Sequence, residues 1–155
     1  MPTLLIAYDT QTGNTKKMAE AIGTGARSVK GVNVVVKKIW TKFFLEDLLE
    51  ADAIILGSPT HYGDLTIQME IFLKRLGKLD MGGKVGAAFG SFDNPEELTE
   101  VFHEKSVGIL NKTMKSFGMN VVDEGLRMFN TPKKKELKVC QEWGRGIAKK
   151  ISSKR

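Results

Sequence analysis

Hydroxyl side chains gather in one short run of the sequence that could bind a phosphate. The run comprises Thr10, Gln11, Thr12, Gly13, Asn14 and Thr15. It lies between an apolar segment of strand length and a segment with helical spacing. The first N–H groups of a helix lack backbone partners and carry partial positive charge, and threonine hydroxyls add further donors. Because glycine lets a ligand approach the backbone closely, the run predicts a phosphate site at the start of a helix.

What this run lacks narrows the type of phosphate compound. It holds no lysine among its donors and no G-x-x-x-x-G-K-[ST] pattern, so we do not expect ATP or GTP. Gly23 and Gly25 resemble part of a dinucleotide-binding pattern, but they lie near the end of the predicted helix and do not follow a strand. A helix capped by threonine, without a ligand, is the simpler alternative.

Apolar segments of strand length alternate with amphipathic segments along the whole chain. The predicted strands are 3–8, 32–38, 53–57, 84–90 and 121–129, and the predicted helices are 14–29, 43–50, 65–76, 96–117 and a last one with Thr131 as N-cap and Pro132 as first residue. The middle strands are uniformly apolar, which is typical of a parallel sheet buried on both faces. We therefore expect an α/β fold, a three-layer, doubly wound, five-stranded parallel sheet. In such sheets ligands bind beyond the carboxyl ends of the strands.

The run 6–22 resembles the flavodoxin signature. Thr10, Gly13, Thr15, Ala19 and Ile22 fill its hydroxyl, small, threonine, alanine and aliphatic positions. The resemblance continues in the loops 57–64 and 88–93 and covers effectively the whole chain, which we expect to form a single domain over 1–155. It implies the strand order 2-1-3-4-5 and an FMN cofactor whose phosphate lies on residues 10–15.

The resemblance also implies a place for the flavin ring, between the loops that follow the third and fourth strands. The residues expected to bind it are Ser58, Pro59, Thr60, His61, Tyr62, Gly63, Gly90, Ser91, Phe92 and Asp93. Tyr62 and Phe92 offer aromatic faces for stacking. The family usually has tyrosine or tryptophan on each side of the ring, so His61 and Trp40 are alternatives to Phe92 for the outer face. The peptide between Gly63 and Asp64 matches the one that turns over toward the flavin in the family.

Two functions fit this resemblance. One is a flavodoxin, a low-potential carrier of single electrons between redox proteins. The other is an FMN-dependent NAD(P)H:quinone reductase of the flavodoxin-like type, whose loops are similar. Such reductases commonly carry longer insertions after the fourth strand, whereas here the next predicted helix begins at Glu96, soon after Gly90. We favour the carrier, for which no catalytic residue is expected.

The composition is that of a folded protein without a metal site or a disulfide. The chain has 155 residues, of which 41% are hydrophobic and 27% charged, with one cysteine and two histidines. This balance excludes a disordered chain, and a single cysteine excludes an internal disulfide. No apolar run approaches the ~20 residues of a membrane span, so we expect no membrane association and a cytoplasmic location. Cys140 falls on the apolar face of the last helix and is expected in the core.

The net charge of +6 comes from the last third of the chain. Residues 1–100 carry a net charge of −2 and residues 101–155 carry +8. No recognition helix or basic strand with interleaved aromatic residues is present, so we expect no nucleic-acid partner. Lys133, Lys134 and Lys135 lie in the first turn of the last helix, where the helix dipole disfavours cations. We expect them to dock an acidic redox partner, and a solvated helix face is the alternative.

Overall fold

A parallel sheet lies at the centre of the computed structural model, which describes residues 1–39, 44–60, 64–92 and 105–152. Its strands are β1 (Thr3–Tyr8), β2 (Asn33–Lys38), β3 (Ala53–Pro59), β4 (Val85–Phe92), β5 (Asn120–Val121) and β6 (Leu126–Phe129). They follow the order β2-β1-β3-β4-β5, and β6 also pairs with β4. Every pair of neighbouring strands is parallel. The predicted strand order 2-1-3-4-5 is therefore confirmed.

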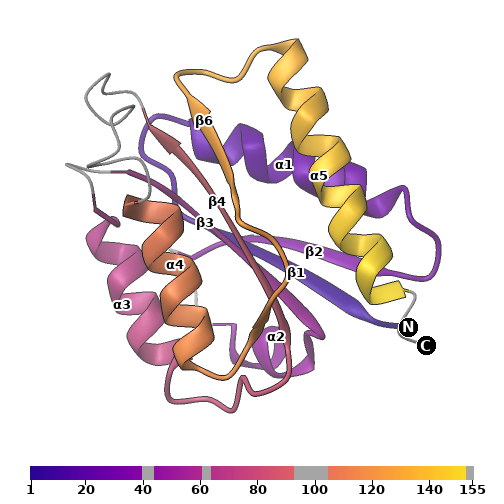
Figure 1. The fold of residues 1–155 in the computed structure, drawn as a ribbon, viewed down its shortest axis with the longest axis vertical. Helices are drawn as coiled ribbons and strands as arrows, with labels where there is room; N and C mark the ends of the chain where they lie inside the picture. The colour runs from indigo at the N-terminus through magenta and orange to yellow at the C-terminus, as the bar shows by residue number, and fades with distance from the viewer. Residues whose placement is uncertain (40–43, 61–63, 93–104, 153–155) are drawn as a thin grey trace.

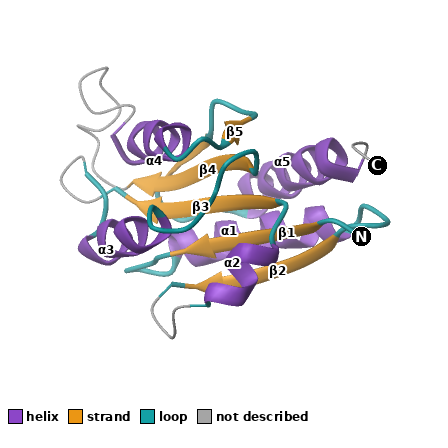
Figure 2. Cartoon of the chain, turned by 90° about the horizontal axis from the view of Figure 1, so that it is seen from below, coloured by secondary structure: helices purple, strands orange, loops and turns teal. Residues whose placement is uncertain are grey.

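Helices cover both faces of this sheet (Figures 1 and 2). They are α1 (Asn14–Arg27), α2 (Leu45–Glu50), α3 (Ile67–Leu76), α4 (Lys105–Ser116) and α5 (Lys134–Ser152). α1 and α5 pack against each other on one face, and α2, α3 and α4 cover the other. The three layers expected from the apolar middle strands are observed.

Alternate residues of the middle strands enter two separate apolar cores. Ile6 and Ile55 lie in the core beneath α1 and α5, whereas Leu5 and Ile54 lie in the core beneath the other helices. All four side chains are fully buried. Because successive side chains of a strand point to opposite faces, a strand covered on both sides needs an unbroken apolar run.

The predicted fifth strand, 121–129, is wrong in one respect, because the chain forms two short strands there. β5 pairs with the start of β4 and β6 pairs with its end. Between them the carboxylate of Asp123 accepts the N–H of Gly125 at 2.8 Å. Gly125 has a φ of 109°, a conformation that glycine adopts without steric cost. This side-chain turn lifts the chain off the ladder between the two strands.

Helix starts also differ from the sequence prediction. α5 begins at Lys134 and not at Pro132, because Glu136 Oε1 accepts the N–H of Lys133 at 3.2 Å and so makes Lys133 the capping residue. α3 begins at Ile67, after Thr66, whose hydroxyl accepts the N–H of Met69 at 3.2 Å. The predicted start of the fourth helix, at Glu96, lies outside the described residues.

Candidate functional site

The hydroxyl-rich run forms the loop between β1 and α1, at the carboxyl edge of the sheet. Thr10 Oγ1 accepts the N–H of Gly13 at 3.1 Å, which closes the loop on itself. Gly13 has a φ of 94° and is the residue before the first turn of α1. Among the described residues, no side chain caps this helix start, and its first turn contains no acidic residue. The first-turn N–H groups are thus left open to an external anion.

Gly13 also leaves room for such an anion. A Cβ on Gly13 would meet no atom of the described residues within 4 Å. Gln11 and Thr12 are exposed beside it, whereas Thr15 is buried. The residues of this loop therefore fit a phosphate group, with backbone N–H groups and the hydroxyl of Thr12 as its accessible donors.

Asp9 is a site residue that the sequence reasoning did not select. Asp9 is 2% exposed, and its carboxylate accepts the N–H of Thr10 at 2.9 Å and the hydroxyl of Thr66 at 2.6 Å. The N–H of Asp9 donates to the carbonyl of Gly57 at 3.0 Å. Asp9 therefore ties the β1–α1 loop both to β3 and to the start of α3.

Further hydroxyl contacts join the ends of β3 and β4 to α1 and α4. The Oγ atoms of Thr15 and Ser91 are 2.8 Å apart. The carbonyl of Ser91 also accepts the N–H of Thr60, at 2.7 Å. Thr60 Oγ1 lies 2.7 Å from the Oγ of Ser106, a buried residue of α4 that the sequence analysis missed. Three loop segments from distant parts of the chain thus meet at one edge of the sheet.

The predicted site residues at the ends of β3 and β4 are partly engaged with the protein itself. Ser58 is fully buried, and its hydroxyl donates to the carbonyl of Pro59 at 2.9 Å. A Cβ on Gly90 would lie 2.8 Å from Ser106 Oγ and 2.9 Å from the carbonyl oxygen of Ser58. Glycine at position 90 therefore allows α4 to pack closely on the sheet.

Phe92 has an aromatic neighbour that the sequence analysis did not predict. Its ring centroid lies 5.4 Å from that of Phe129, at the end of β6, with the two planes tilted by 46°. Phe129 is 38% exposed. The stacking of Phe92 on a flavin stays a prediction, and Phe129 would support the ring of Phe92 from the side of β6.

Several predicted site residues lie outside the described part of the chain. These are His61, Tyr62, Gly63 and Asp93, together with Trp40. Asp64 is described, and its Oδ1 accepts the N–H of Leu65 at 2.7 Å. The aromatic faces on either side of the ring and the turning peptide at Gly63 stay predictions.

The lysines expected to dock a partner lie where β6 leads into α5. Lys133, Lys134 and Lys135 are exposed. Glu136 follows them, but its carboxylate is used to cap the N–H of Lys133. Because β6 ends at the carboxyl edge of the sheet, these lysines lie at the same edge as the loops described above (Figure 1).

Cys140 lies in the core, as expected, and away from this edge. It is a fully buried residue of α5, and its Sγ lies 3.6 Å from the Sδ of Met128. Burial raises the pKa of its thiol to about 12, so it is inert as a nucleophile. Within the described ranges we find no group of three or more His, Cys, Asp or Glu side chains that could hold a metal ion. The helices of those ranges likewise include none that is long and apolar enough to cross a membrane.

Comparison with known proteins supplies the family. The sequence profile of the family described as Flavodoxin matches residues 6–144. A flavodoxin from Aquifex aeolicus is 44% identical over 94 residues, which are 59% of this chain and 50% of that protein. An NAD(P)H dehydrogenase (quinone) from Acidithiobacillus ferrooxidans is 35% identical over 114 residues, which are 59% of this chain and 57% of that protein. The chain thus spans about half the length of these curated relatives.

A solved structure is similar over nearly the whole length of both chains. It is a flavodoxin from the domain Archaea, 36% identical, with a TM-score of 0.85, and the match covers 97% of this chain and 99% of that one. This chain therefore belongs to the flavodoxin family, and it is a flavodoxin-like flavoprotein. Family membership implies a flavin cofactor, for which the open start of α1 and the hydroxyl-lined edge of the sheet are suitable.

Proposed function

We propose that this chain binds FMN and carries single electrons between redox proteins. The open start of α1 is the observation that carries the proposal. Its first turn contains no acidic residue and has no side-chain cap from the described part of the chain, and it follows a loop held in shape by Thr10 and Asp9. An anion at this position would find backbone N–H groups already oriented, at little cost in conformational entropy.

The flavin supplies the redox chemistry when bound, and the chain supplies binding and orientation. The N–H groups of the first turn of α1 and the hydroxyl of Thr12 would hold the phosphate. Pro59 and Thr60 at the end of β3 and Phe92 at the end of β4 would position the ring. The links from Thr15 to Ser91 and from Ser91 to Thr60 would keep these two groups of residues in a fixed relative position.

The redox partners of this carrier are proteins with an acidic docking surface. Lys133, Lys134 and Lys135 are exposed at the edge where the flavin would lie. Opposite charges steer two proteins together and raise the association rate, and salt screens that effect. The three lysines would therefore set the orientation of the partner relative to the flavin.

Charge reversal at these lysines tests the docking role. The FMN-loaded triple variant Lys133→Glu, Lys134→Glu, Lys135→Glu should transfer electrons to an acidic rubredoxin about tenfold more slowly at low salt. Its rate should also lose most of its dependence on salt. The matched control reverses three lysines that are exposed toward the opposite edge of the sheet, Lys30, Lys74 and Lys78. Unchanged rates and unchanged salt dependence in the triple variant would leave the lysines as a solvated helix face.

A second candidate function is an FMN-dependent NAD(P)H:quinone reductase. The observation in its favour is the similarity to the Acidithiobacillus ferrooxidans protein named as such. Steady-state turnover of NADH or NADPH with a soluble quinone distinguishes the electron carrier from the reductase. The carrier should show only slow background oxidation, whereas saturable turnover with both substrates would favour the reductase.

A further inference from the structure

Asp9, the residue that follows β1, carries a buried carboxylate directly before the hydroxyl-rich loop. Aspartate is among the residue types that are almost never fully buried unless they are paired or hydrogen-bonded. Burial of a carboxylate costs free energy of desolvation that a small neutral side chain avoids. The two oxygens of Asp9 must therefore be satisfied by hydrogen bonds within the protein.

The two oxygens of this carboxylate hold two different elements. Oδ1 accepts the N–H of Thr10, in the loop between β1 and α1, at 2.9 Å. Oδ2 accepts the hydroxyl of Thr66, the residue before α3, at 2.6 Å. Thr66 is 3% exposed, and its Oγ1 also accepts the N–H of Met69 at 3.2 Å. Because that N–H can only donate, the hydroxyl proton of Thr66 is committed to Asp9.

The shape of the β1–α1 loop depends on the bond between Thr10 and Asp9. Thr10 donates its N–H to Asp9 and accepts the N–H of Gly13 at Oγ1, at 3.1 Å. Gly13 is the residue before the first turn of α1. The N–H groups of Thr10 and Gly13 are thus bonded within the protein, and the first turn of α1 is left to bind an anion. Without the carboxylate, the N–H of Thr10 would lose its acceptor and the loop would gain conformational freedom.

We propose that Asp9 is a positioning residue for the flavin. Through Thr10 it holds the β1–α1 loop in the shape that accepts the phosphate, and through Thr66 it holds that loop against the start of α3. A loop that is already ordered loses less conformational entropy when the phosphate binds, so affinity is higher. The inference rests on the proposed binding of FMN and deepens it, because it assigns part of the affinity to a residue that acts through its neighbours.

The ratio of the affinities for FMN and riboflavin tests this role, because only FMN carries the phosphate. Both ligands are titrated against the FMN-free protein, and binding is followed by the quenching of flavin fluorescence. Asp9→Ala removes both acceptors and should lower the FMN-to-riboflavin affinity ratio about tenfold. Asp9→Asn keeps an acceptor for the N–H of Thr10 and can donate to the hydroxyl of Thr66, so its ratio should stay within about threefold of the parent ratio.

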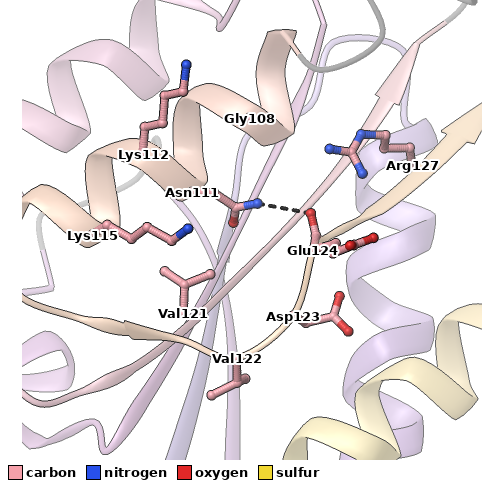
Figure 3. Close-up of a pocket in the computed structure, with 9 residues that line it drawn as sticks. All are labelled: Gly108, Asn111, Lys112, Lys115, Val121, Val122, Asp123, Glu124 and Arg127. Carbon is pink, nitrogen blue, oxygen red and sulfur yellow. Dashed lines mark hydrogen bonds between the residues drawn. The ribbon is translucent and has the colours of Figure 1, made fainter.

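Asp123→Ala is the matched control, because Asp123 uses its carboxylate in the same way at a different place. Its Oδ1 accepts one backbone N–H, from Gly125 at 2.8 Å, and one side-chain N–H, from Trp143 at 2.9 Å. It lines the pocket between α4 and the outer strands (Figure 3) and follows β5, which pairs with the start of β4, away from the strand ends at the candidate site. Asp9→Ala and Asp123→Ala should both lower the urea midpoint of the FMN-free protein. Only Asp9→Ala should change the affinity ratio by more than about twofold.

A second pair of variants replaces Asp9→Ala if that protein does not fold. Thr66→Val removes the hydroxyl that donates to Asp9 and should lower the ratio about threefold, whereas Thr66→Ser keeps the hydroxyl and should leave the ratio unchanged.

The outcomes separate this inference from the proposed function. A parent protein that binds FMN and riboflavin equally would overturn both. A parent that prefers FMN, with an unchanged ratio in Asp9→Ala or in its substitute Thr66→Val, would overturn the positioning role alone. An equal fall of the ratio in Asp123→Ala would do the same, because the loss would then follow from lower stability and not from the place of Asp9.

Discussion

The hydroxyls of Thr15 and Ser91 meet at 2.8 Å in the interior, joining the first turn of α1 to the end of β4. Thr15 is 1% exposed and Ser91 is 4% exposed. The two residues are far apart in the sequence, yet each belongs to a loop predicted to bind the flavin. A buried pair of this kind fixes the distance between the start of α1, where we expect the phosphate, and the end of β4, where we expect the flavin ring.

A double-mutant cycle measures the interaction free energy between these two hydroxyls. Thr15→Val and Ser91→Ala each leave the other hydroxyl buried without its partner, so each should lower the free energy of unfolding by ~1–3 kcal/mol. The double variant should lose less than the sum of the two, by ~0.5–1.5 kcal/mol, because no orphan hydroxyl remains. Urea unfolding of the FMN-free protein provides the measurement. Strict additivity of the two losses would show that the hydroxyls do not interact.

The phosphate loop should discriminate between FMN and riboflavin. Thr12→Ala removes an exposed hydroxyl beside the open start of α1 and should weaken FMN binding by ~1–3 kcal/mol, the scale of a hydrogen bond to a charged group. Riboflavin, which lacks the phosphate, should bind both proteins equally. The control is Thr24→Ala, because the Thr24 hydroxyl bonds to the carbonyl of Glu20 further along α1. Equal affinity of the parent protein for FMN and riboflavin would refute phosphate binding by this loop.

Two glycines of α5 should respond oppositely to the same substitution. A Cβ on Gly144 would collide with the carbonyl oxygen of Ile22 in α1, whereas a Cβ on Gly146 would meet nothing within 4 Å. Gly144→Ala should therefore destabilise the fold by ~1–3 kcal/mol through forced separation of the two helices. Gly146→Ala should stabilise it by up to ~1 kcal/mol through helix propensity. Thermal unfolding of the two variants checks this, and a stabilised Gly144→Ala would contradict the close approach of α1 and α5.

Stability should fall at alkaline pH because of Cys140. Burial raises the pKa of this thiol to about 12, while an unfolded chain ionises its cysteine near pH ~8.5. Below that pH the thiol is protonated in both the folded and the unfolded state, so the contribution of Cys140 to the free energy of unfolding is constant. Above it the unfolded state loses the proton first, so the free energy of unfolding falls by up to ~1.4 kcal/mol per pH unit until the folded thiol also ionises.

Comparison with Cys140→Ala isolates this effect. The pKa of Tyr8 is also raised, by burial and by the charge of Glu20. Because Tyr8 is present in both proteins, its effect cancels in the difference between their unfolding free energies. The difference in unfolding free energy between parent and variant should shrink steadily from pH 8.5 to pH 10.5, by roughly 2–3 kcal/mol over that range. Parallel pH profiles of the two proteins would mean that the thiol reaches water in the folded state.

The fold was predictable because its signals are local or periodic. The uniform apolar strands around Ile6 and Ile55 predict a sheet covered on both faces, and the hydroxyl-rich run at Thr10 predicts the loop at its edge. The split of the fifth strand was missed although Asp123 and Gly125 carry a turn signal, because the apolar residues around them suggested one continuous strand. The start of α5 was misplaced because Pro132 suggested a first helical residue, whereas Glu136 marks the actual cap.

Contacts between distant loops could not be predicted from local patterns. Asp9 bonds to Thr66, and Thr60 lies against Ser106 in α4, across long sequence separations. Such pairs depend on which strand ends meet at the carboxyl edge, which only the assembled sheet determines. Phe129 was missed for the same reason, because its packing on Phe92 follows from the pairing of β6 with β4.

Stepwise photoreduction of the FMN-loaded protein, followed by absorbance, tests the carrier function most directly. The account predicts two separate one-electron steps, seen as a long-wavelength band that rises after the first electron and disappears after the second. A direct loss of the flavin absorbance in one two-electron step, with no such band at any stage, would contradict it.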